Sequence, residues 1–164
     1  MGLDFGIYYK KKNEAIPDWE TDYNAYYEWM NKHELCYGRK SWELVHALRL
    51  PIDDGEDPIV EKEYWDELIA SMKTFLGDND SSYFDIIRDD YCAIDKYHEM
   101  DVDVPPDILN RVVQYEVWYD KTFDETPHLG YDFALGYLAE FYKADEQIQK
   151  YFNDEYEVRA YVSY

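Results

Sequence analysis

Hydrophobic and polar residues alternate at both ends of the chain, as in a β-strand with one buried face. Near the start, one face of such a strand carries Leu3, Phe5, Ile7 and Tyr9. Near the end, the same alternation gives Tyr156, Val158, Ala160, Val162 and Tyr164. Strands at opposite ends of a chain can pair and close one domain, so the pattern predicts a small sheet formed by the N- and C-terminal strands.

Between these strands, apolar residues recur every three or four positions, the period of a helix with one buried face. The spacing predicts helices over residues 22–30, 34–49, 58–76, 81–100, 107–118 and 131–152. In the second helix, Pro51 provides the stop. In the third, Asp57 is the expected cap and Pro58 suits the first helical position. The expected fold is α+β, a mainly helical single domain over residues 1–164.

The helix expected over residues 81–100 has an apolar side and an acidic side. Its apolar stripe comprises Phe84, Ile87, Tyr91 and Ile94. Asp85 and Asp89 lie one turn apart on another side, and Asp95 and Glu99 repeat that spacing. Like charges one turn apart repel, so the acids are unfavourable for stability and are expected to be exposed to solvent.

Composition narrows the class of protein. Apolar residues make up 46% of the 164 residues and aromatic residues 19%, which excludes a disordered acidic tail. Apolar runs are too short for a membrane span, and the first twelve residues carry their charge after the apolar part, unlike a secretory signal. Cys36 and Cys92 are far apart in the sequence and do not form a closely spaced pair, which is typical of ordinary thiols in a reducing compartment. These features predict a cytoplasmic protein.

The net charge of −21 is concentrated in the middle third of the chain. Residues 1–50 contain 8 acidic and 7 basic residues, whereas residues 51–110 contain 18 and 4. A field of this sign repels nucleic acid and anionic lipid and attracts basic protein surfaces. The expected partner is therefore a basic protein, with no direct binding of nucleic acid or membrane.

Motifs that would name an enzyme or a metal site are incomplete. Gly38 to Ser41 read Gly-Arg-Lys-Ser, but the inserted Arg39 breaks the spacing of a phosphate-binding loop. His33 and Cys36 lack the second close pair that structural zinc needs. Residues 78–89 resemble a calcium loop, but Tyr83 replaces the turn glycine. No metal, cofactor, catalytic residue or enzymatic activity is therefore expected.

Two stretches resemble a family of short, uncharacterised phage and bacterial proteins. These proteins open with Met-Gly-Leu-Asp and an apolar strand, and later carry Tyr-x-Arg-Lys followed by an Ile/Val-His pair. The matching residues here are Gly2, Leu3, Asp4, Tyr37, Arg39, Lys40, Val45 and His46. The likeness covers about the first third of the chain and departs at Gly38, where the family tends to have Trp. It implies a phage or mobile-element context and carries no catalytic residue.

Charge and resemblance together favour an acidic phage-type inhibitor of a nucleic-acid-binding host defence protein, an anti-CRISPR or otherwise an anti-restriction protein. DNA carries one charge per ~1.7 Å of axis. Carboxylates spaced i,i+4 on a helix lie ~5–6 Å apart, so a helical face could imitate a phosphate row. The expected partner-binding residues are Asp78, Asp80, Asp85, Asp89, Asp90, Asp95, Glu99, Asp101 and Asp103.

A second interpretation belongs to another class of protein. Arg39, Lys40 and His46 could form a site in a small nucleotide- or ligand-binding protein or enzyme. The two interpretations differ in whether these three residues converge in a concave pocket.

Overall fold

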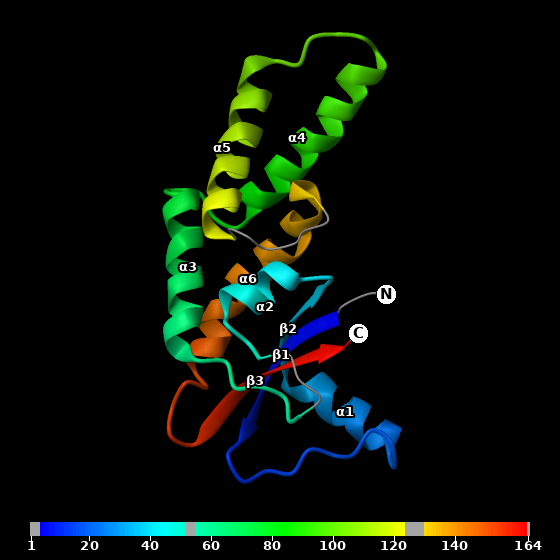
Figure 1. Ribbon diagram of the computed structural model, residues 1–164, viewed down its shortest axis with the longest axis vertical. Helices are drawn as coiled ribbons and strands as arrows, with labels where there is room; N and C mark the ends of the chain where they lie inside the picture. Colours follow the sequence, from blue (N-terminus) through cyan, green and yellow to red (C-terminus); the bar gives the residue numbers. More distant parts are fainter. Residues whose placement is uncertain (1–3, 52–54, 124–129, 164) are drawn as a thin grey trace.

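The computed structural model describes residues 4–51, 55–123 and 130–163. These residues form six helices and a three-stranded antiparallel sheet, which confirms the expected α+β single domain. The molecule is elongated, with the sheet near one end and a pair of helices projecting from the other (Figure 1).

The sheet is built around β1 (Asp4–Lys11), which lies between β2 (Glu34–Arg39) and β3 (Tyr156–Ser163). β1 pairs with β3 along its whole length, from Asp4 opposite Ser163 to Lys11 opposite Tyr156. Phe5 and Ile7 are fully buried in the same apolar core as Val158, and Val162 is partly buried against this core. The predicted pairing of the terminal strands is confirmed.

The second strand corrects the sequence prediction, because residues 34–49 do not form one helix. Burial alternates along β2, and its Cys36 pairs with Ile7 of β1. The chain then turns at Lys40, whose φ of 54° is left-handed, and helix α2 (Trp42–Ala47) follows. Leu35 had completed an apparent helical stripe with residues of α2, although it belongs to the strand.

Gly38 is required where it stands in β2. A Cβ at this position would lie 2.4 Å from Ser41 Oγ and 3.2 Å from the ring of Phe141. A tryptophan, which the resembling phage and bacterial proteins tend to have here, would not fit this packing. The resemblance therefore departs at a position that the fold constrains.

The remaining helices follow the predicted order with shifted ends. They are α1 (Tyr23–His33), α3 (Lys62–Leu76), α4 (Ser82–Glu99), α5 (Pro106–Thr122) and α6 (Tyr131–Gln149). The start of α3 is the largest correction, since Asp57 and Pro58 do not open it. Asp57 instead accepts a hydrogen bond from the Tyr8 hydroxyl at 2.7 Å, and Ile59 forms a bridge to Arg159 of β3.

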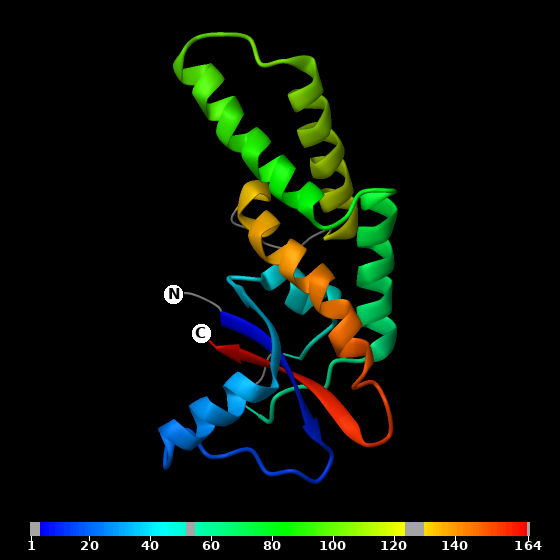
Figure 2. The ribbon, with the colours of Figure 1, turned by 180° about the vertical axis from the view of Figure 1, so that it is seen from behind.

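Helix α6 joins the sheet to the helical end of the molecule. It runs from the projecting pair of helices toward the sheet (Figures 1 and 2). Phe141 of α6 stacks on Phe5 of β1, with ring centroids 5.6 Å apart, and also contacts Trp65 of α3. Eight residues of α6 are buried, so this helix forms the centre of the apolar core.

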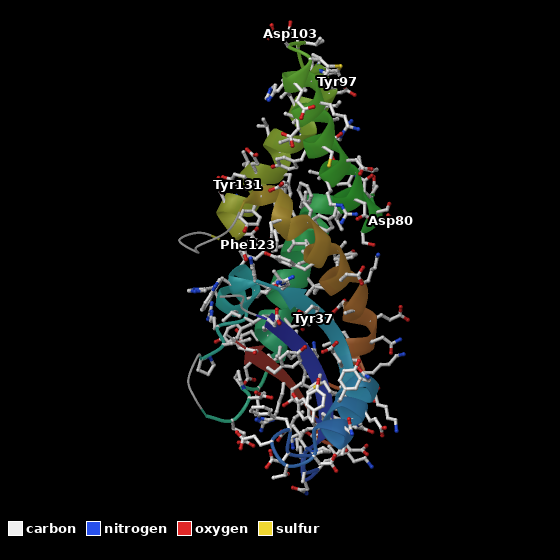
Figure 3. All side chains as sticks on the ribbon, turned by 90° about the vertical axis from the view of Figure 1, so that its right-hand side faces the viewer. Tyr37, Asp80, Tyr97, Asp103, Phe123 and Tyr131 are labelled. Carbon is white, nitrogen blue, oxygen red and sulfur yellow. The ribbon has the colours of Figure 1, made fainter. Side chains whose placement is uncertain are left out.

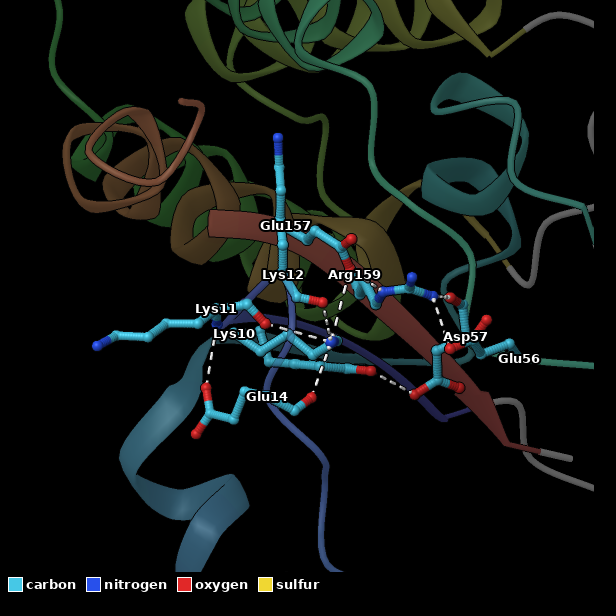
Figure 4. Close-up of polar contacts among 9 residues, drawn as sticks. Lys10, Lys11, Lys12, Glu14, Glu56, Asp57, Glu157 and Arg159 are labelled. Carbon is cyan, nitrogen blue, oxygen red and sulfur yellow. Dashed lines mark hydrogen bonds and ion pairs between the residues drawn. The ribbon is translucent and has the colours of Figure 1, made fainter. Parts of the chain in front are cut away.

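The other face of the sheet is covered by α1 and a network of charged residues. Arg159 donates to Glu157 Oε2 at 2.8 Å and also to the main-chain carbonyl of Asp57. Lys10 is buried and donates to three main-chain carbonyls, the shortest being that of Glu14 at 3.0 Å (Figure 4). Both positive charges therefore have hydrogen-bond partners. Such partners are needed to place a charge away from water without a large loss of stability.

Candidate partner-binding surface

The acidic residues predicted to bind a partner lie on or beside a hairpin made by α4 and α5. Aromatic packing fixes its base: Phe75 of α3 stacks on Trp118 of α5 and on Phe84 of α4. Above the base, the Tyr91 hydroxyl of α4 donates to Glu116 of α5 at 2.7 Å. The hairpin is thus held by contacts between its helices and projects beyond the rest of the molecule (Figure 2).

Asp90 is the exception among the predicted partner-binding residues. It is 5% exposed, and Arg111 of α5 forms a two-pronged ion pair with it, at 2.7 and 2.8 Å. The same arginine also approaches Asp107, at 3.7 Å. Asp90 therefore fastens α4 to α5 and is not available to a partner.

Two of the predicted acids lie at the base of the hairpin, in the turn before α4. Asp78 is exposed. Asp80 accepts hydrogen bonds from the main chain and side chain of Ser82, which holds the pKa of its carboxyl below the usual range. Figure 3 shows Asp80 at the base of α4 and Asp103 at the far tip, so the acids span the length of the hairpin.

The exposed side of α4 carries the acids that the sequence analysis placed there. Asp85 is half-exposed and pairs with Arg88 at 3.4 Å. Asp89, Asp95 and Glu99 are exposed, and within the described ranges no basic side chain lies within ion-pair distance of them. On the opposite side, Phe84 and Ile87 are buried while Tyr91 and Ile94 are partly buried against the core. The predicted two-sided helix is confirmed.

The tip places a charged residue where helices usually end in glycine. Asp101 has a φ of 52°, and its N–H bonds to the carbonyl of His98 at 3.1 Å. The N–H of Val102 reaches back to the carbonyl of Tyr97 at 3.0 Å, which completes a Schellman motif. Glycine favours this left-handed position, but here an exposed carboxylate occupies it, beside the exposed Asp103.

Charge along α4 is sparser than on DNA. The stretch from Asp85 to Glu99 covers ~21 Å of helix, and Arg88 and Lys96 interrupt its four exposed or half-exposed acids. One DNA strand carries ~6 phosphates over that length. The row therefore supplies a negative field and does not reproduce the charge density of a nucleic acid strand.

The second interpretation required Arg39, Lys40 and His46 to converge. Arg39 ends β2 and Lys40 forms the following turn, whereas His46 lies at the other end of α2. His46 lines an open groove of about 590 Å³ between α2, α3 and α5, which also includes Arg49 and Lys121 but neither Arg39 nor Lys40. The predicted trio is not brought together, and Arg49 and Lys121 are basic neighbours that the sequence analysis missed.

The groove also has a polar floor. Ser71 and Thr122 hydrogen-bond to each other at 3.0 Å, and the indole N–H of Trp118 donates to Ser71. At its rim, Arg49 lies over the ring of Tyr64, with 4.2 Å between the guanidinium carbon and the ring centroid. Basic side chains and hydroxyl groups can donate hydrogen bonds to a small anion and so bind it.

Two further buried groups are the carboxylate of Glu43 and the thiol of Cys36. Glu43 of α2 is 2% exposed and accepts hydrogen bonds from the hydroxyls of Tyr119 and Tyr137. Burial and the contact with Glu43 raise the pKa of both tyrosines. Burial also raises the pKa of the Cys36 thiol, which disfavours the reactive thiolate.

In the part of the chain that the structure describes, no cluster of three or more His, Cys, Asp or Glu residues is arranged to hold a metal ion.

The sequence analysis also missed three apolar residues on the outer side of α5. Leu109, Val113 and Val117 are exposed. Their spacing of four residues was visible as a second apolar row beside the buried Val112, Tyr115 and Tyr119. The exposed row adds nothing to the prediction of a helix, because the buried row is sufficient for it.

Comparison with known proteins adds no relative. No protein-family model, curated protein or solved structure matches the chain. The resemblance of residues 1–12 and 34–48 to phage and bacterial proteins therefore stays a prediction. Among the described residues, none of the helices combines the length and apolar character needed to cross a membrane.

Proposed function

We propose that this protein is an acidic, phage-type inhibitor that binds the basic nucleic-acid-binding surface of a host defence protein. The observation that carries the proposal is the projecting α4–α5 hairpin, whose exposed carboxylates Asp89, Asp95 and Glu99 have no ion-pair partner among the described residues. Because the fold does not use these charges, they are free to meet a basic surface.

The field of the whole chain supports the same class of partner. The net charge of −21 accelerates encounter with a positively charged protein and opposes encounter with nucleic acid. The resemblance to phage proteins selects the partners to test first, which are CRISPR effectors and then restriction enzymes. On this proposal the protein catalyses no reaction and acts by occupying the surface.

The proposal is tested by DNA cleavage with a panel of purified CRISPR effector complexes and restriction enzymes, with and without the protein. Inhibition of at least one enzyme is expected. The variant Asp85→Lys with Asp89→Lys should weaken that inhibition and slow association, because steering depends on charge. The control is Glu146→Lys with Asp154→Lys, which changes net charge equally at exposed positions outside the hairpin.

Two outcomes would contradict the proposal. One is unimpaired cleavage by every enzyme of the panel at a large excess of the protein. The other is inhibition that both double variants reduce equally, which would assign the effect to total charge and not to the hairpin. Thermal melts of both variants accompany the assay, to show that each remains folded.

A second candidate function is the binding of a small anion in the groove lined by His46, Arg49 and Lys121. The observation that favours it is the gathering of three basic side chains around Ser71 and Thr122 in a chain otherwise rich in acid. Titration with inorganic phosphate and with AMP, followed by NMR, tests it. Shifts confined to this groove and abolished by Lys121→Met would support it, and an unchanged spectrum at millimolar ligand would exclude it.

A further inference from the structure

An apolar ridge runs along the outer side of α5. It consists of Leu109, Val113 and Val117, which are 44%, 54% and 62% exposed. Residues four apart on a helix are neighbours, so the three side chains form a continuous row ~12 Å long. Valine is a weaker helix former than the polar residues common at exposed positions. The ridge therefore has no evident benefit for the isolated helix.

The ridge shares one face of the hairpin with Asp95 and Glu99 of α4, which lie one turn apart. Tyr91 of α4 donates to Glu116 of α5, which fixes the flanks that face each other. Val113 precedes Glu116 by three residues and shares its flank. Asp95 follows Tyr91 by four residues on α4 and is exposed. A partner contacting the ridge would thus meet carboxylates along its border.

At the tip, the ridge continues into a shallow pocket of about 450 Å³. Leu109, Val102 and Val104 line this pocket together with the polar residues His98, Asp101 and Asp103. Val102 and Met100 are also more than half exposed. The surface is therefore apolar along the ridge and acidic where the ridge ends at the tip, which is comparable to an interface core with a charged rim.

Charge decides between the possible occupants of this surface. A second copy of the chain would bring another −21 charge and another set of tip carboxylates against the first. An anionic membrane and a nucleic acid are repelled for the same reason. A protein that presents an apolar strip bordered by Lys or Arg meets both features, because long basic side chains pack their stems on apolar atoms while their charged ends reach carboxylates.

We infer that the ridge of α5 is a docking surface for an apolar strip bordered by basic residues on another protein. This inference deepens the proposed function and rests on it only for the sign of the partner's charge. It differs from imitation of DNA, because the apolar contact supplies most of the affinity and the acids supply orientation and association rate. It also accounts for a hairpin whose charge is sparser than that of DNA.

The test uses the whole protein and a synthetic amphipathic peptide with a leucine stripe bordered by lysines. A second peptide keeps the lysines and replaces every leucine with glutamine. Binding is measured by fluorescence anisotropy at about 0.1 M and about 1 M salt, where the Debye length falls from ~10 Å to ~3 Å. The leucine peptide should bind at both salt concentrations, and the glutamine peptide should lose its binding at the higher one.

The decisive variant is Val113→Gln with Val117→Gln, which removes two exposed apolar side chains and keeps good helix formers. It should weaken binding of the leucine peptide at least ~10-fold, with an unchanged thermal melt. The matched control on the same helix is Asn110→Ala with Gln114→Ala, whose exposed polar residues lie outside the ridge. This control should bind as the natural chain does.

The result that overturns the inference is equal binding of the two peptides, or a Val113→Gln, Val117→Gln variant that binds as well as its control. Sedimentation of the protein alone gives a further outcome, since a dimer abolished by the same variant would make a second copy the occupant and also overturn it. The peptide assay does not involve a nuclease. The protein could therefore inhibit no enzyme of the cleavage panel and still bind the leucine peptide through the ridge. That result would disprove the proposed function and leave the docking surface intact.

Discussion

The sheet end and the hairpin use charged residues in opposite ways. Around the sheet, Lys10 is buried and the side chain of Arg159 is 11% exposed, and both are bound by carboxylates and main-chain carbonyls. On the hairpin, Asp89, Asp95 and Glu99 are exposed, and no described basic residue pairs with them. Charges in the first region hold segments of the chain together. On the hairpin the buried pair of Asp90 and Arg111 does the same, whereas the exposed carboxylates contribute little to the fold. Substitutions should therefore affect stability in one region and binding in the other.

The largest contrast is expected when a new charge is placed in each region. Ala160 of β3 is fully buried, so Ala160→Asp leaves a carboxylate without a partner and should cost about 4 kcal/mol. Val113→Asp on the exposed ridge should change the unfolding free energy by less than about 1 kcal/mol. Urea denaturation measures both, and similar losses in the two variants would contradict the division into regions.

A smaller effect is expected when an existing charge is removed. Arg159→Met leaves Glu157 without its principal partner in a largely buried place and should cost about 3 kcal/mol. The control is Arg88→Met, which breaks the exposed pair with Asp85 and should cost no more than about 0.5 kcal/mol. A cost for Arg88→Met as large as that for Arg159→Met would show that the exposed charges of the hairpin also stabilise the fold.

Acid unfolding sharpens the same comparison. The hydrogen bond from Arg159 holds the pKa of Glu157 below its usual range. The stability that this pair contributes is therefore complete above the unfolded value of about 4.3 and is lost as pH falls through the folded pKa. Burial raises the pKa of Asp57, which acts in the opposite direction, but the pKa values of Glu157, Glu14 and Asp66 are all lowered.

The expected result is a loss of stability below about pH 4.3. Arg159→Met should move the midpoint of acid unfolding to higher pH, because the variant lacks the stability that this pair contributes and protonation of the other carboxylates then unfolds it sooner. Arg88→Met should leave the midpoint where it is. Circular dichroism during an acid titration measures all three proteins, and a midpoint that Arg159→Met does not move would contradict the assignment.

The smallest predicted effect is a stabilisation at the tip. Asp101 occupies a left-handed position that glycine adopts with less strain, so Asp101→Gly should raise the free energy of unfolding by about 0.5–1 kcal/mol. The control is Asp103→Gly, which offers no such relief. A thermal melt compares the two. A destabilising Asp101→Gly would show that the carboxylate supports the Schellman motif.

Sequence periodicity was sufficient for the outer strands and for most of the helices. Trp65, Leu68 and Met72 of α3 are buried as their spacing predicts. It failed at residues 34–39, because the buried positions of β2 are Cys36 and Gly38, which give no apolar alternation beside Leu35 and Tyr37. It also failed at Asp57. The hydrogen bond from the distant Tyr8 determines the position of this residue, and not a local capping pattern.

The candidate surface was predicted only in part for a related reason. Exposed acids at regular helical spacing were recognised in α4. Asp90 is also an acid of α4, but it is buried in an ion pair with Arg111, which lies 21 positions further along the chain. The ridge of α5 is the reverse case, since apolar residues at helical spacing predict burial, and only the arrangement of the neighbouring helices leaves them exposed.

The place of β1 in the middle of the sheet has a consequence for how the chain folds. The ribosome makes β1 before the six described helices, but makes one of its two partners, β3, only after them. Until then Phe5 and Ile7 lack the neighbours that β3 provides, and one edge of β1 has open main-chain groups. Pairing between such distant segments is slow because a long loop must close first. The helices can gather around Phe141 beforehand, so closure of the sheet is the step at which a nascent chain is most exposed to aggregation.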